Sequence, residues 1–370
     1  MTDLAITAVQ IPETPDGGSS GGGERPDSAA DFRACQALRE AHELQKWGNL
    51  DRCATASEAM EFWRGNEYEE RHLYIARLGT ELVGLCSVTL PLRENTNTAG
   101  IDVLVAPAHR RCGWGRQLLE YAESVAAGRG RTSLDAYCEL PLELVDRSAG
   151  LLPAKSGAGG LPRDEASTAF ASGAGYELEQ VERSSRLALP VPPERLEMLE
   201  AGASAFARDY AMVAWAGSCP DGFVAEYAGL KARMSTDVPT AGFDWGAEDW
   251  DVARVRDEER TLARSGVQVQ VTAAVHTASG ALAAYTVLNW RSDVPATVIQ
   301  QDTLVSAEHR GHRLGMLVKL GNLRLAQQRW PAARSVLTWN ASENQHMLAI
   351  NISLGFKPAG YEGEWQKRLG

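Results

Sequence analysis

The stretch IDVLVAPAHRRCGWG at residues 101–115 is matched by QDTLVSAEHRGHRLG at residues 301–315, at a constant offset of 200. Six of the fifteen aligned positions are identical, including an aspartate, a His-Arg pair and the final glycine. Each copy has an apolar run that favours a strand, then a turn rich in basic residues and glycine, then an amphipathic helix. The fold is therefore decided by a strand–turn–helix unit that occurs twice.

The elements around each copy repeat in the same order. Apolar and alternating runs predict three strands ending at the turn, a helix after it and a further strand behind the helix. In the first copy we expect these elements at 72–78, 81–90, 99–105, up to about 127, and 133–138. In the second copy we expect them at 268–276, 282–290, 296–305, up to about 329, and 335–339. Each unit then ends in a short helix that runs into a glycine and an aromatic residue, at Gly175-Tyr176 and Gly355-Phe356.

A boundary between the two units is expected at LPVPP, residues 189–193. Three prolines within four residues end a strand there, and a helical pattern starts at Glu194. We therefore expect two domains, residues 1–190 and 194–370. The first unit has twenty more residues between its His-Arg pair and its final aromatic residue, and we expect this excess, at 145–163, to form an inserted surface loop.

Charge and composition restrict the partners of this chain. It has 37 Lys and Arg against 48 Asp and Glu, a formal net charge of -11, which disfavours a nucleic-acid partner. The same sign favours the approach of a cationic small molecule such as an amine. At 44% hydrophobic and 23% charged residues, the composition is that of a soluble globular protein.

The cysteines and the apolar runs argue against metal and membrane sites. The six cysteines form no C-x-x-C pair and have no histidine partners at metal-ligand spacing, so we expect no metal site. No run reaches the roughly 18 apolar residues of a membrane span, and the start of the sequence does not have the pattern of a signal peptide. A reducing, cytoplasmic location and no membrane partner are the consistent expectation.

The turn within the repeat is suited to binding an anion. The first N–H groups of a helix have no partner within the helix, and the helix dipole adds partial positive charge at the same place. In the first copy, Arg110, Gly113 and Gly115 form R-x-x-G-x-G, whose glycines let a diphosphate approach the backbone closely. Neither turn has the full G-x-G-x-x-G of a dinucleotide-binding oxidoreductase, so that function is not indicated.

The order strand, R-x-x-G-x-G turn, helix, strand, helix and Gly-aromatic resembles the acyl-CoA-binding core of the GNAT N-acetyltransferase superfamily. Its double occurrence is similar to the tandem GNAT proteins of actinobacteria, a group to which mycothiol synthase belongs. The resemblance covers nearly the whole chain and is most specific at VSAEHRGHRLGMLVKLGN and TWNASENQHMLAINISLGF in the second half. It implies an α/β (α+β) fold, in which each half has a mixed, twisted sheet whose two central parallel strands diverge around the pantetheine arm of an acyl-CoA.

The resemblance also implies that acetyl-CoA is a co-substrate, and it assigns the binding residues by position. Backbone groups of the strands are expected to hold the pantetheine amides, and N–H groups of the turns to hold the pyrophosphate. In the second half, the side chain of an asparagine at the start of the last helix is expected to reach the same arm. The expected acyl-CoA-binding residues are Val103, Leu104, Val105, Arg110, Arg111, Cys112, Gly113, Trp114, Gly115, Arg116, Thr303, Leu304, Val305, Arg310, Gly311, His312, Arg313, Leu314, Gly315, Met316 and Asn344.

Two departures from the family pattern bear on the chemistry. Arg313 stands where the family usually has its first glycine, and it either points into solvent or adds a charge to the phosphates. Many family members protonate the leaving thiolate from a tyrosine five residues before the final aromatic residue, where this chain has Ala171 and Asn351. For the base that accepts the amine proton, the candidates are Asp102 and Asp302, although a strand carboxylate can equally be a plain hydrogen-bond partner.

Other polar and aromatic residues have a functional and a structural interpretation. His109 and His309 lie directly before the turns, and we expect them to be structural or exposed rather than catalytic. The charged stretch 254–264 is expected to be a solvated helix face. Helices near this position cover the acceptor in small-molecule members of the family, so Trp250 and Asp251 are weak acceptor candidates.

The leading prediction is an acetyl-CoA-dependent N-acetyltransferase that acts on a small-molecule primary amine by direct attack in a ternary complex. The alternative is a non-catalytic or partly degenerate CoA-binding tandem scaffold, which the absent tyrosine favours. We expect the active site in the second half, because its last helix is better formed and begins with Asn344, while the first half still binds acyl-CoA. The acceptor and the oligomeric state are not specified by the sequence.

Overall fold

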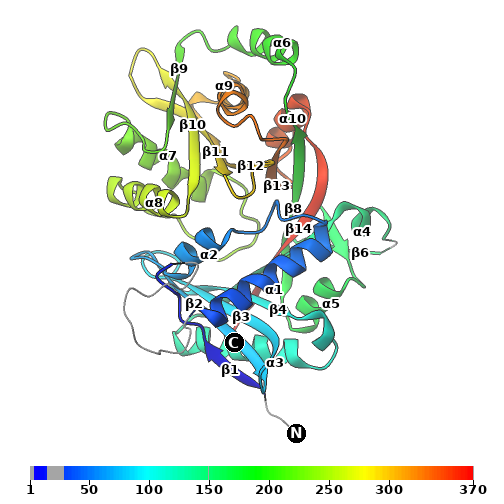
Figure 1. Cartoon of the computed structure of the whole chain (residues 1–370). Helices are drawn as coiled ribbons and strands as arrows, with labels where there is room; N and C mark the ends of the chain where they lie inside the picture. The colour runs from blue at the N-terminus through cyan, green and yellow to red at the C-terminus, as the bar shows by residue number, and fades with distance from the viewer. Residues whose placement is uncertain (1–3, 15–28, 149, 370) are drawn as a thin grey trace.

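A single sheet runs through the whole molecule. The computed structural model of the chain describes residues 4–14, 29–148 and 150–369. Its main sheet has twelve strands in the order β1-β2-β3-β4-β5-β14-β8-β13-β12-β11-β10-β9. Figure 1 shows the two halves of the chain at the two ends of this sheet, with helices packed against it. A separate two-stranded sheet contains β6 and β7.

The first half follows the predicted order of elements. Its strands are β1 (Ala5–Ala8), β2 (Glu69–Leu78), β3 (Glu81–Pro91), β4 (Thr98–Val105), β5 (Ser133–Pro141), β6 (Leu151–Pro153), β7 (Gly160–Pro162) and β8 (Glu177–Ala188). Its helices are α1 (Ala30–Trp47), α2 (Ala56–Trp63), α3 (Trp114–Gly128), α4 (Leu142–Asp146) and α5 (Ala166–Gly173), with a short 3-10 turn at Pro107–His109.

The second half repeats this order. Its strands are β9 (Tyr210–Ala216), β10 (Val267–His276), β11 (Leu282–Arg291), β12 (Thr297–Val305), β13 (Ser335–Ala341) and β14 (Lys357–Arg368). Its helices are α6 (Pro193–Ser204), α7 (Val224–Asp237), α8 (Val252–Arg264), α9 (Leu314–Arg329) and α10 (Gln345–Leu354), with a second 3-10 turn at Ala307–His309. The mixed α/β fold expected from the sequence is confirmed.

The two central parallel strands of each half diverge, as predicted. Strands β4 and β5 pair only where residues 98–100 meet residues 133–135. Strands β12 and β13 pair only where residues 297–299 meet residues 335–337. Beyond these residues, the described parts of each strand pair show no further pairing, so a gap opens toward the turn that follows β4 or β12.

The last strand of each half is exchanged. Strand β8, from the first half, pairs with β13 of the second half from Glu182↔Ala341 to Ala188↔Ser335. Strand β14, from the second half, lies between β8 and β5, and it pairs with β5 from Gly360↔Pro141 to Arg368↔Ser133. In Figure 1, β14 passes in red from the second half into the first, where the chain ends. The two predicted domains are thus joined by exchanged strands in one sheet.

Strand β14 also supplies the hydrophobic core of the first half. Trp365 is 1% exposed and lies in a cluster with Leu118, Leu134 and Val181 of the first half. Its indole N–H donates to Sγ of Cys138 at 3.3 Å. A side chain of this size contributes a large share of core stability when it is fully buried. The first half therefore depends on a residue that the chain supplies near its other end.

The segment 145–163 differs from the expected surface loop. It contains the end of α4 and the hairpin β6–β7, which pairs from Leu151↔Pro162 to Pro153↔Gly160. Leu161 is fully buried in the first-half core. The glycines and prolines of this segment make the tight turn and short strands of a hairpin, and Leu161 anchors it. The expectation of a simple loop is therefore wrong for this segment.

Local signals fix the ends of the two helices that cover the first-half gap. Helix α1 ends at Gly48, whose φ of 71° a residue with a side chain rarely adopts. Helix α2 begins with a capping box, in which the Thr55 hydroxyl accepts from the Glu58 amide and the Glu58 carboxylate accepts from the Thr55 amide. At the boundary between the halves, α2 contacts α8, and Arg264 donates to Glu61 at 2.7 Å.

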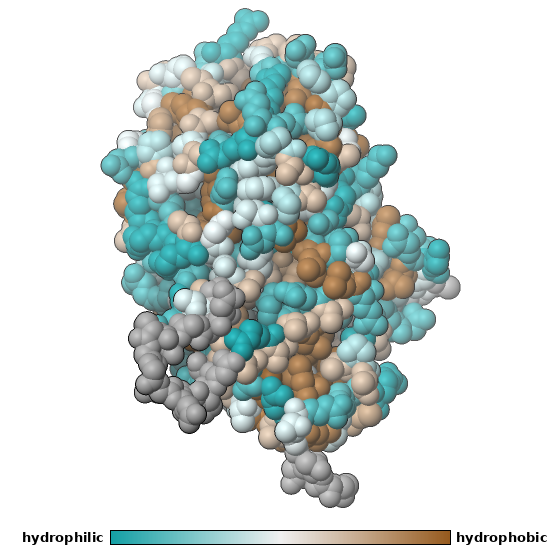
Figure 2. All heavy atoms as spheres, in the orientation of Figure 1, coloured by the Kyte–Doolittle hydropathy of each residue, from teal (hydrophilic) through white to brown (hydrophobic). Residues whose placement is uncertain are grey.

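The surface gives no sign of a membrane-spanning helix. Among the described residues, no helix is long and apolar enough to cross a bilayer. Figure 2 shows hydrophilic side chains over most of one face, with smaller hydrophobic patches near the junction of the two halves and on the first half.

Candidate active site

A large cavity lies in the first half, where β4 and β5 diverge. Its volume is about 1660 Å³, and its walls come from α1, α2, the diverging parts of β4 and β5, the turn at residues 110–116, α5 and α8. Single small-molecule pockets are typically about 300–1,000 Å³. This cavity therefore has room for an extended ligand and a second molecule beside it.

The turn after β4 presents a row of free donors at the cavity. Arg111 and Gly113 have φ values of 64° and 88°, and α3 begins directly after them. In the described part of the chain, the backbone N–H groups of residues 111–115 donate to no other protein group. Arg111 and Arg116 line the cavity and form no ion pair with any described residue. Free amides at a helix start, flanked by unpaired arginines, make a seat for a diphosphate.

The corresponding turn in the second half has the same backbone conformation, but its arginines contact different groups. Gly311 and Arg313 have φ values of 87° and 55°, so the two left-handed positions are kept while the glycine and the arginine are interchanged. The guanidinium of Arg313 lies 4.5 Å from the centre of the Phe206 ring. Arg310 is 3.3 Å from Asp237. Arg310 therefore has a carboxylate partner, whereas Arg313 is exposed and contacts only a ring face, so its two predicted roles stay predictions.

A glycine lies one position into each helix of the repeat, close to the last helix of the same half. A Cβ atom on Gly115 would lie 3.5 Å from Phe170 and from Val105. A Cβ atom on Gly315 would lie 3.3 Å from Ile350. Phe170 and Ile350 are on α5 and α10, the last helices of the two halves. The two glycines therefore let the last helix of each half approach the phosphate turn closely.

The two predicted bases form the same ion pair in each half. Asp102 lines the cavity and is 2.8 Å from Arg39 on α1. Asp302 lies outside this cavity, is 3.4 Å from Lys231 on α7 and accepts from the Tyr285 hydroxyl at 3.1 Å. Both carboxylates therefore already have a cationic partner in the protein. The geometry thus agrees better with the alternative that both are structural partners.

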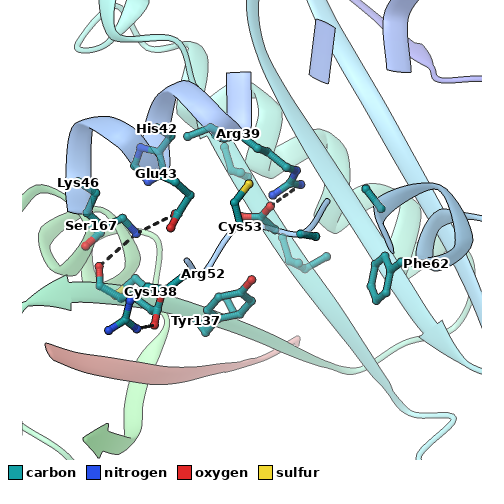
Figure 3. A pocket seen from close by; sticks show the side chains of 18 of the residues that line it. Arg39, His42, Glu43, Lys46, Arg52, Cys53, Phe62, Tyr137, Cys138 and Ser167 are labelled. Carbon is teal, nitrogen blue, oxygen red and sulfur yellow. Dashed lines mark hydrogen bonds and ion pairs between the residues drawn. The ribbon is translucent and has the colours of Figure 1, made fainter. Parts of the chain in front are cut away.

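The family's tyrosine position holds no acid in either half. Ala171 lines the cavity. Asn351 is fully buried, and its amide N–H donates to Oδ1 of Asn340 at 2.6 Å. A different tyrosine reaches the cavity: Tyr137 on β5 is 62% exposed toward its interior, as Figure 3 shows. Burial raises the pKa of Tyr137, and the nearby Asp102 carboxylate raises it further, so the hydroxyl keeps its proton at neutral pH.

A second group that sequence reasoning missed is Glu43 on α1. Burial raises its pKa, while the ammonium of Lys46, 3.8 Å away, opposes the shift. Its Oε2 is buried without a hydrogen-bond partner among the described residues. In Figure 3 the carboxyl group points down from α1 into the pocket above β5. The neighbouring His42 has a pKa lowered to about 4 by burial and is neutral at pH 7. Glu43 is therefore the better candidate for a proton acceptor.

A signal for Tyr137 was present in the sequence. Asp135, Tyr137 and Glu139 occupy alternate positions of β5, so three polar side chains share one face of a strand in the middle of the sheet. Central strands ordinarily carry apolar residues on both faces when helices cover them. Glu43, in contrast, has the pattern of a solvent-facing helical acid, and only the packing of α1 over the gap brings it to the cavity.

The cavity floor is tied to the second half through Glu139. Its carboxylate pairs with Arg52 and accepts from the indole N–H of Trp339 on β13 at 2.8 Å. The Arg52 guanidinium lies 3.8 Å from the ring centre of Trp47 and also donates to Ser184 on β8 at 3.0 Å. These contacts hold α1, β5, β8 and β13 together at the exchange of strands.

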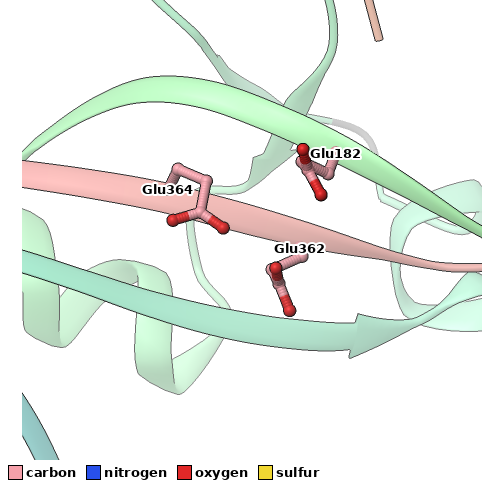
Figure 4. Close-up of side chains that lie close together, drawn as sticks. All are labelled: Glu182, Glu362 and Glu364. Carbon is pink, nitrogen blue, oxygen red and sulfur yellow. The ribbon is translucent and has the colours of Figure 1, made fainter. Parts of the chain in front are cut away.

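Three more carboxyl groups lie beside Glu139, on the exchanged strands β8 and β14. Oxygens of Glu182, Glu362 and Glu364 lie within 4.8 Å of one another, on β8 and β14, as Figure 4 shows. Glu362 stands directly opposite Glu139 on one side and Glu182 on the other. Burial raises the pKa of all three, to about 7 for Glu182, and the negative charge of nearby carboxylates raises each further. Carboxyl groups this close keep protons between them at neutral pH.

The cavity collects most of the first-half positions predicted to bind acyl-CoA. Those that line it are Val103, Leu104, Val105, Arg110, Arg111, Gly113, Gly115 and Arg116. Cys112 and Trp114 do not line it, and neither do the predicted second-half positions from Thr303 to Met316. The position of the cavity therefore favours the first half as the active site, in contrast to our expectation for the second half.

The remaining predicted residues have structural contacts. Asn344 caps α10, where its Oδ1 accepts from the Met347 amide at 3.1 Å. Asp251 caps α8 in the same way. His109 is 3.0 Å from Glu81, and His309 is 2.9 Å from the Tyr210 hydroxyl. Of the two weak acceptor candidates, Trp250 lines the cavity.

Comparison with known proteins agrees with this geometry. Residues 37–143 match the acetyltransferase (GNAT) family. A tandem GNAT protein from the clavulanic acid biosynthesis pathway is 26% identical, with a TM-score of 0.72 over 100% of this chain and 99% of its own. A GCN5-related N-acetyltransferase from Sphaerobacter thermophilus is 12% identical, with a TM-score of 0.59 over 99% of this chain and 95% of its own.

A third structure has the same fold within a larger protein. It is a GCN5-related glucosamine N-acetyltransferase region of a fungal multi-domain GH3 β-N-acetylglucosaminidase, 13% identical, with a TM-score of 0.62 over 99% of this chain and 38% of its own. No curated protein sequence matches this chain. The diverging strands, the free amides of the turn and the full-length structural match together show that this chain has the mixed α/β fold of a tandem GNAT protein, with the acetyltransferase family's sequence pattern in its first half.

Proposed function

We propose that the protein is an acyl-CoA-dependent N-acyltransferase that transfers an acetyl group to a small-molecule primary amine in its first-half cavity. The observation that carries this proposal is the continuity between the free amides of residues 111–115, the gap between β4 and β5, and the large cavity behind it. A diphosphate, an extended amide arm and an amine acceptor need these three features in this order.

Acetyl-CoA is the co-substrate in this proposal. The diphosphate binds the free amides of the turn, with Arg111 and Arg116 as its cations. The pantetheine arm lies against the edge of β4 at residues 103–105, which pairs with β3 on one side and with no described strand on the other. The thioester then reaches the part of the cavity between α1 and β5, where Glu43 and Tyr137 project.

The transfer requires a neutral amine and a proton for the leaving thiolate. Glu43 accepts one proton from the acceptor's ammonium group, and the freed nitrogen attacks the thioester carbonyl carbon. The C–N bond forms and the C–S bond breaks. Tyr137 donates its proton to the CoA sulfur and recovers one from the nitrogen as the amide is completed. Water then takes the proton from Glu43.

A second candidate function is a CoA-binding scaffold without transfer activity. The observation that favours it is the absence of a tyrosine at the family position in both halves, where Ala171 and Asn351 stand. The more specific resemblance to the mycothiol synthase group, and the cytoplasmic location, stay predictions.

Calorimetric titration of acetyl-CoA separates the two halves. We expect Gly115→Asp to abolish binding, because the added carboxylate lies at the diphosphate seat, with its Cβ 3.5 Å from Phe170. The matched Gly315→Asp variant makes the same change at the equivalent position of the second half. We expect it to keep binding within about threefold of the unaltered protein.

A coupled measurement then tests transfer. Release of free thiol is followed with a panel of primary amines, using the unaltered protein and Tyr137→Phe. Binding of acetyl-CoA without any thiol release across the panel would favour the scaffold. Loss of binding in Gly315→Asp and its retention in Gly115→Asp would move the site to the second half.

A further inference from the structure

One wall of the first-half cavity belongs to the second half. Helix α8 turns a continuous face toward the cavity, and the spacing of that face is three and four residues, as expected for one side of a helix. Of its residues only Val255 is fully buried in the second-half core. The residues of α8 and its flanks that line the cavity are Glu248, Trp250, Arg254, Asp257, Glu258, Thr261, Leu262 and Ser265. The stretch expected to be a solvated helix face is therefore a cavity wall.

Glu258 lies in this wall and shares its cationic partner, Lys231, with a second carboxylate. Its carboxylate oxygens are 3.0 and 3.1 Å from the ammonium nitrogen of Lys231 on α7. The same ammonium is 3.4 Å from Asp302, so one cation serves two carboxylates. Lys231 is 7% exposed, whereas the side chain of Glu258 is 38% exposed. The negative charge that Lys231 leaves uncompensated is therefore accessible from the cavity through Glu258.

The neighbouring cation in the wall, Arg254, also has two carboxylate partners. Arg254 is 3.2 Å from Glu94 and 3.4 Å from Glu248. Its guanidinium lies 4.5 Å from the ring centre of Trp250 and 4.8 Å from that of Tyr68. Lys231 and Arg254 thus share four carboxylate partners, of which Glu248 and Glu258 line the cavity. The net negative charge of the wall lies beside aromatic rings, an environment that stabilises an added ammonium group.

We propose that Glu258 binds a second cationic group on the acceptor, so that the site selects molecules with two amino groups over simple monoamines. This inference rests on the proposed transferase function. One amino group reaches Glu43 for transfer, and the other donates to Glu258 on the opposite wall. Glu258 is thus a positioning and specificity residue, and the second half determines which amines the first half uses.

Through this wall, the second half contributes to the first-half site. Asp302, the counterpart of Asp102, holds Lys231 in place, and Lys231 in turn orients Glu258. The Tyr285 hydroxyl donates to Asp302 and so holds the carboxylate at the start of this series of contacts. The repeated aspartate ion pair therefore supports a residue of the neighbouring half's site.

The test compares putrescine with butylamine as acceptors at saturating acetyl-CoA. For the unaltered protein, we expect kcat/KM for putrescine to exceed that for butylamine by at least about tenfold, the typical gain from one charge-assisted hydrogen bond. Glu258→Gln is expected to raise KM for putrescine about tenfold, leave kcat within about twofold and leave butylamine unchanged. Glu258→Asp is expected to restore part of the difference. Glu197→Gln, an exposed charge change on α6, serves as the control and is expected to change nothing.

Equal use of the two amines by the unaltered protein would overturn the inference, and so would an equal loss of kcat for both amines in Glu258→Gln. Failure of the proposed function has a different signature, which is binding of acetyl-CoA with no thiol release from any amine. In that case calorimetry of putrescine with the acetyl-CoA complex still decides the inference. Weaker binding by at least about tenfold in Glu258→Gln supports it, and unchanged or absent binding contradicts it.

Discussion

Surroundings, rather than residue type, separate the carboxylates of the cavity into different roles. Asp102 is held by Arg39 at 2.8 Å, whereas Glu43 has one buried oxygen without a partner and a pKa raised by burial. In the proposed reaction, the oxygen of Glu43 that has no partner is therefore the one that accepts the proton.

Replacing Glu43 by glutamine is expected to slow transfer by about 100-fold, the usual contribution of a general base. In the unaltered protein the rate rises with pH as Glu43 loses its proton, through a pKa above the ordinary value. In Glu43→Gln that rise is expected to be lost. The measurement is a pH–rate profile of thiol release. Glu40→Gln is the control, because Glu40 lies on the same helix without lining the cavity, and a similar loss in this control would contradict the role of Glu43.

Lys319 on α9 is a buried cation whose energetic cost can be measured. It is 2% exposed, and its nearest recorded interaction among the described residues is with the Phe356 ring, 6.0 Å away. Burial lowers the pKa of its ammonium from 10.5 to about 7. Between these two pH values the unfolded chain binds a proton that the folded chain does not, so the stability of the unaltered protein rises with pH across this window.

Lys319→Met keeps the side-chain shape and removes the charge. We expect the variant to be more stable at pH 7 by about 1–3 kcal/mol, and the advantage to shrink as pH rises toward 10.5. Urea unfolding of both proteins at several pH values measures this difference. A variant that is less stable than the parent at pH 7 would show that Lys319 has a favourable partner.

Candidate site residues could be predicted from the sequence where their role depends on backbone conformation. Glycine and helix geometry predicted an anion-binding turn at Arg110, Gly113 and Gly115, the resemblance extended it to residues 111–116, and the structure places most of this turn at the cavity. Glu43 and Glu258 could not be predicted, because their roles depend on which helix packs over which gap. Tyr137 lies between these cases, since alternate polar residues on β5 signal a polar face without saying what it faces.

At the scale of elements, the sequence predicts strands and helices well and predicts their neighbours poorly. Hydrophobic patterning identified the strand–turn–helix units in both halves, because the pattern depends on each segment's own burial. Which strand lies beside β5 depends on contacts between segments more than 200 residues apart. Strand β14 has the same alternating pattern whether it pairs within its own half or with the other, so its exchange leaves no local mark in the sequence.

Because β14 is exchanged into the first half, a substitution on β14 is expected to destabilise the first half. Trp365→Ala removes a side chain that is 1% exposed in the first-half core, and a loss of about 3–5 kcal/mol is expected. Amide hydrogen exchange should accelerate in β4 and β5 more than in β11. Met198→Ala is the control, because Met198 on α6 is 66% exposed. Acceleration confined to the second half would contradict the exchanged arrangement.

At the scale of the whole molecule, the repeat predicted two domains, and the sheet joins them. A chain cut after residue 190 yields two fragments, each without the strand that fills the place beside its own β5 or β13. We expect neither 1–190 nor 191–370 to fold alone, because each exposes an unpaired edge and an incomplete core. Mixed or co-expressed, the fragments are expected to associate and recover acetyl-CoA binding. Gel filtration and calorimetry measure both outcomes, and a folded, monomeric single fragment would contradict this prediction.

The position of β14 also sets the order of events during synthesis on the ribosome. Domains generally fold as they emerge, the N-terminal one first. Here β5 cannot pair with β14 until residues 357–368 have been translated and have left the exit tunnel. The nascent first half therefore spends the whole translation time of the second half with an open strand edge. A chain that stops early keeps that edge unpaired, and an unpaired strand edge can pair with another chain.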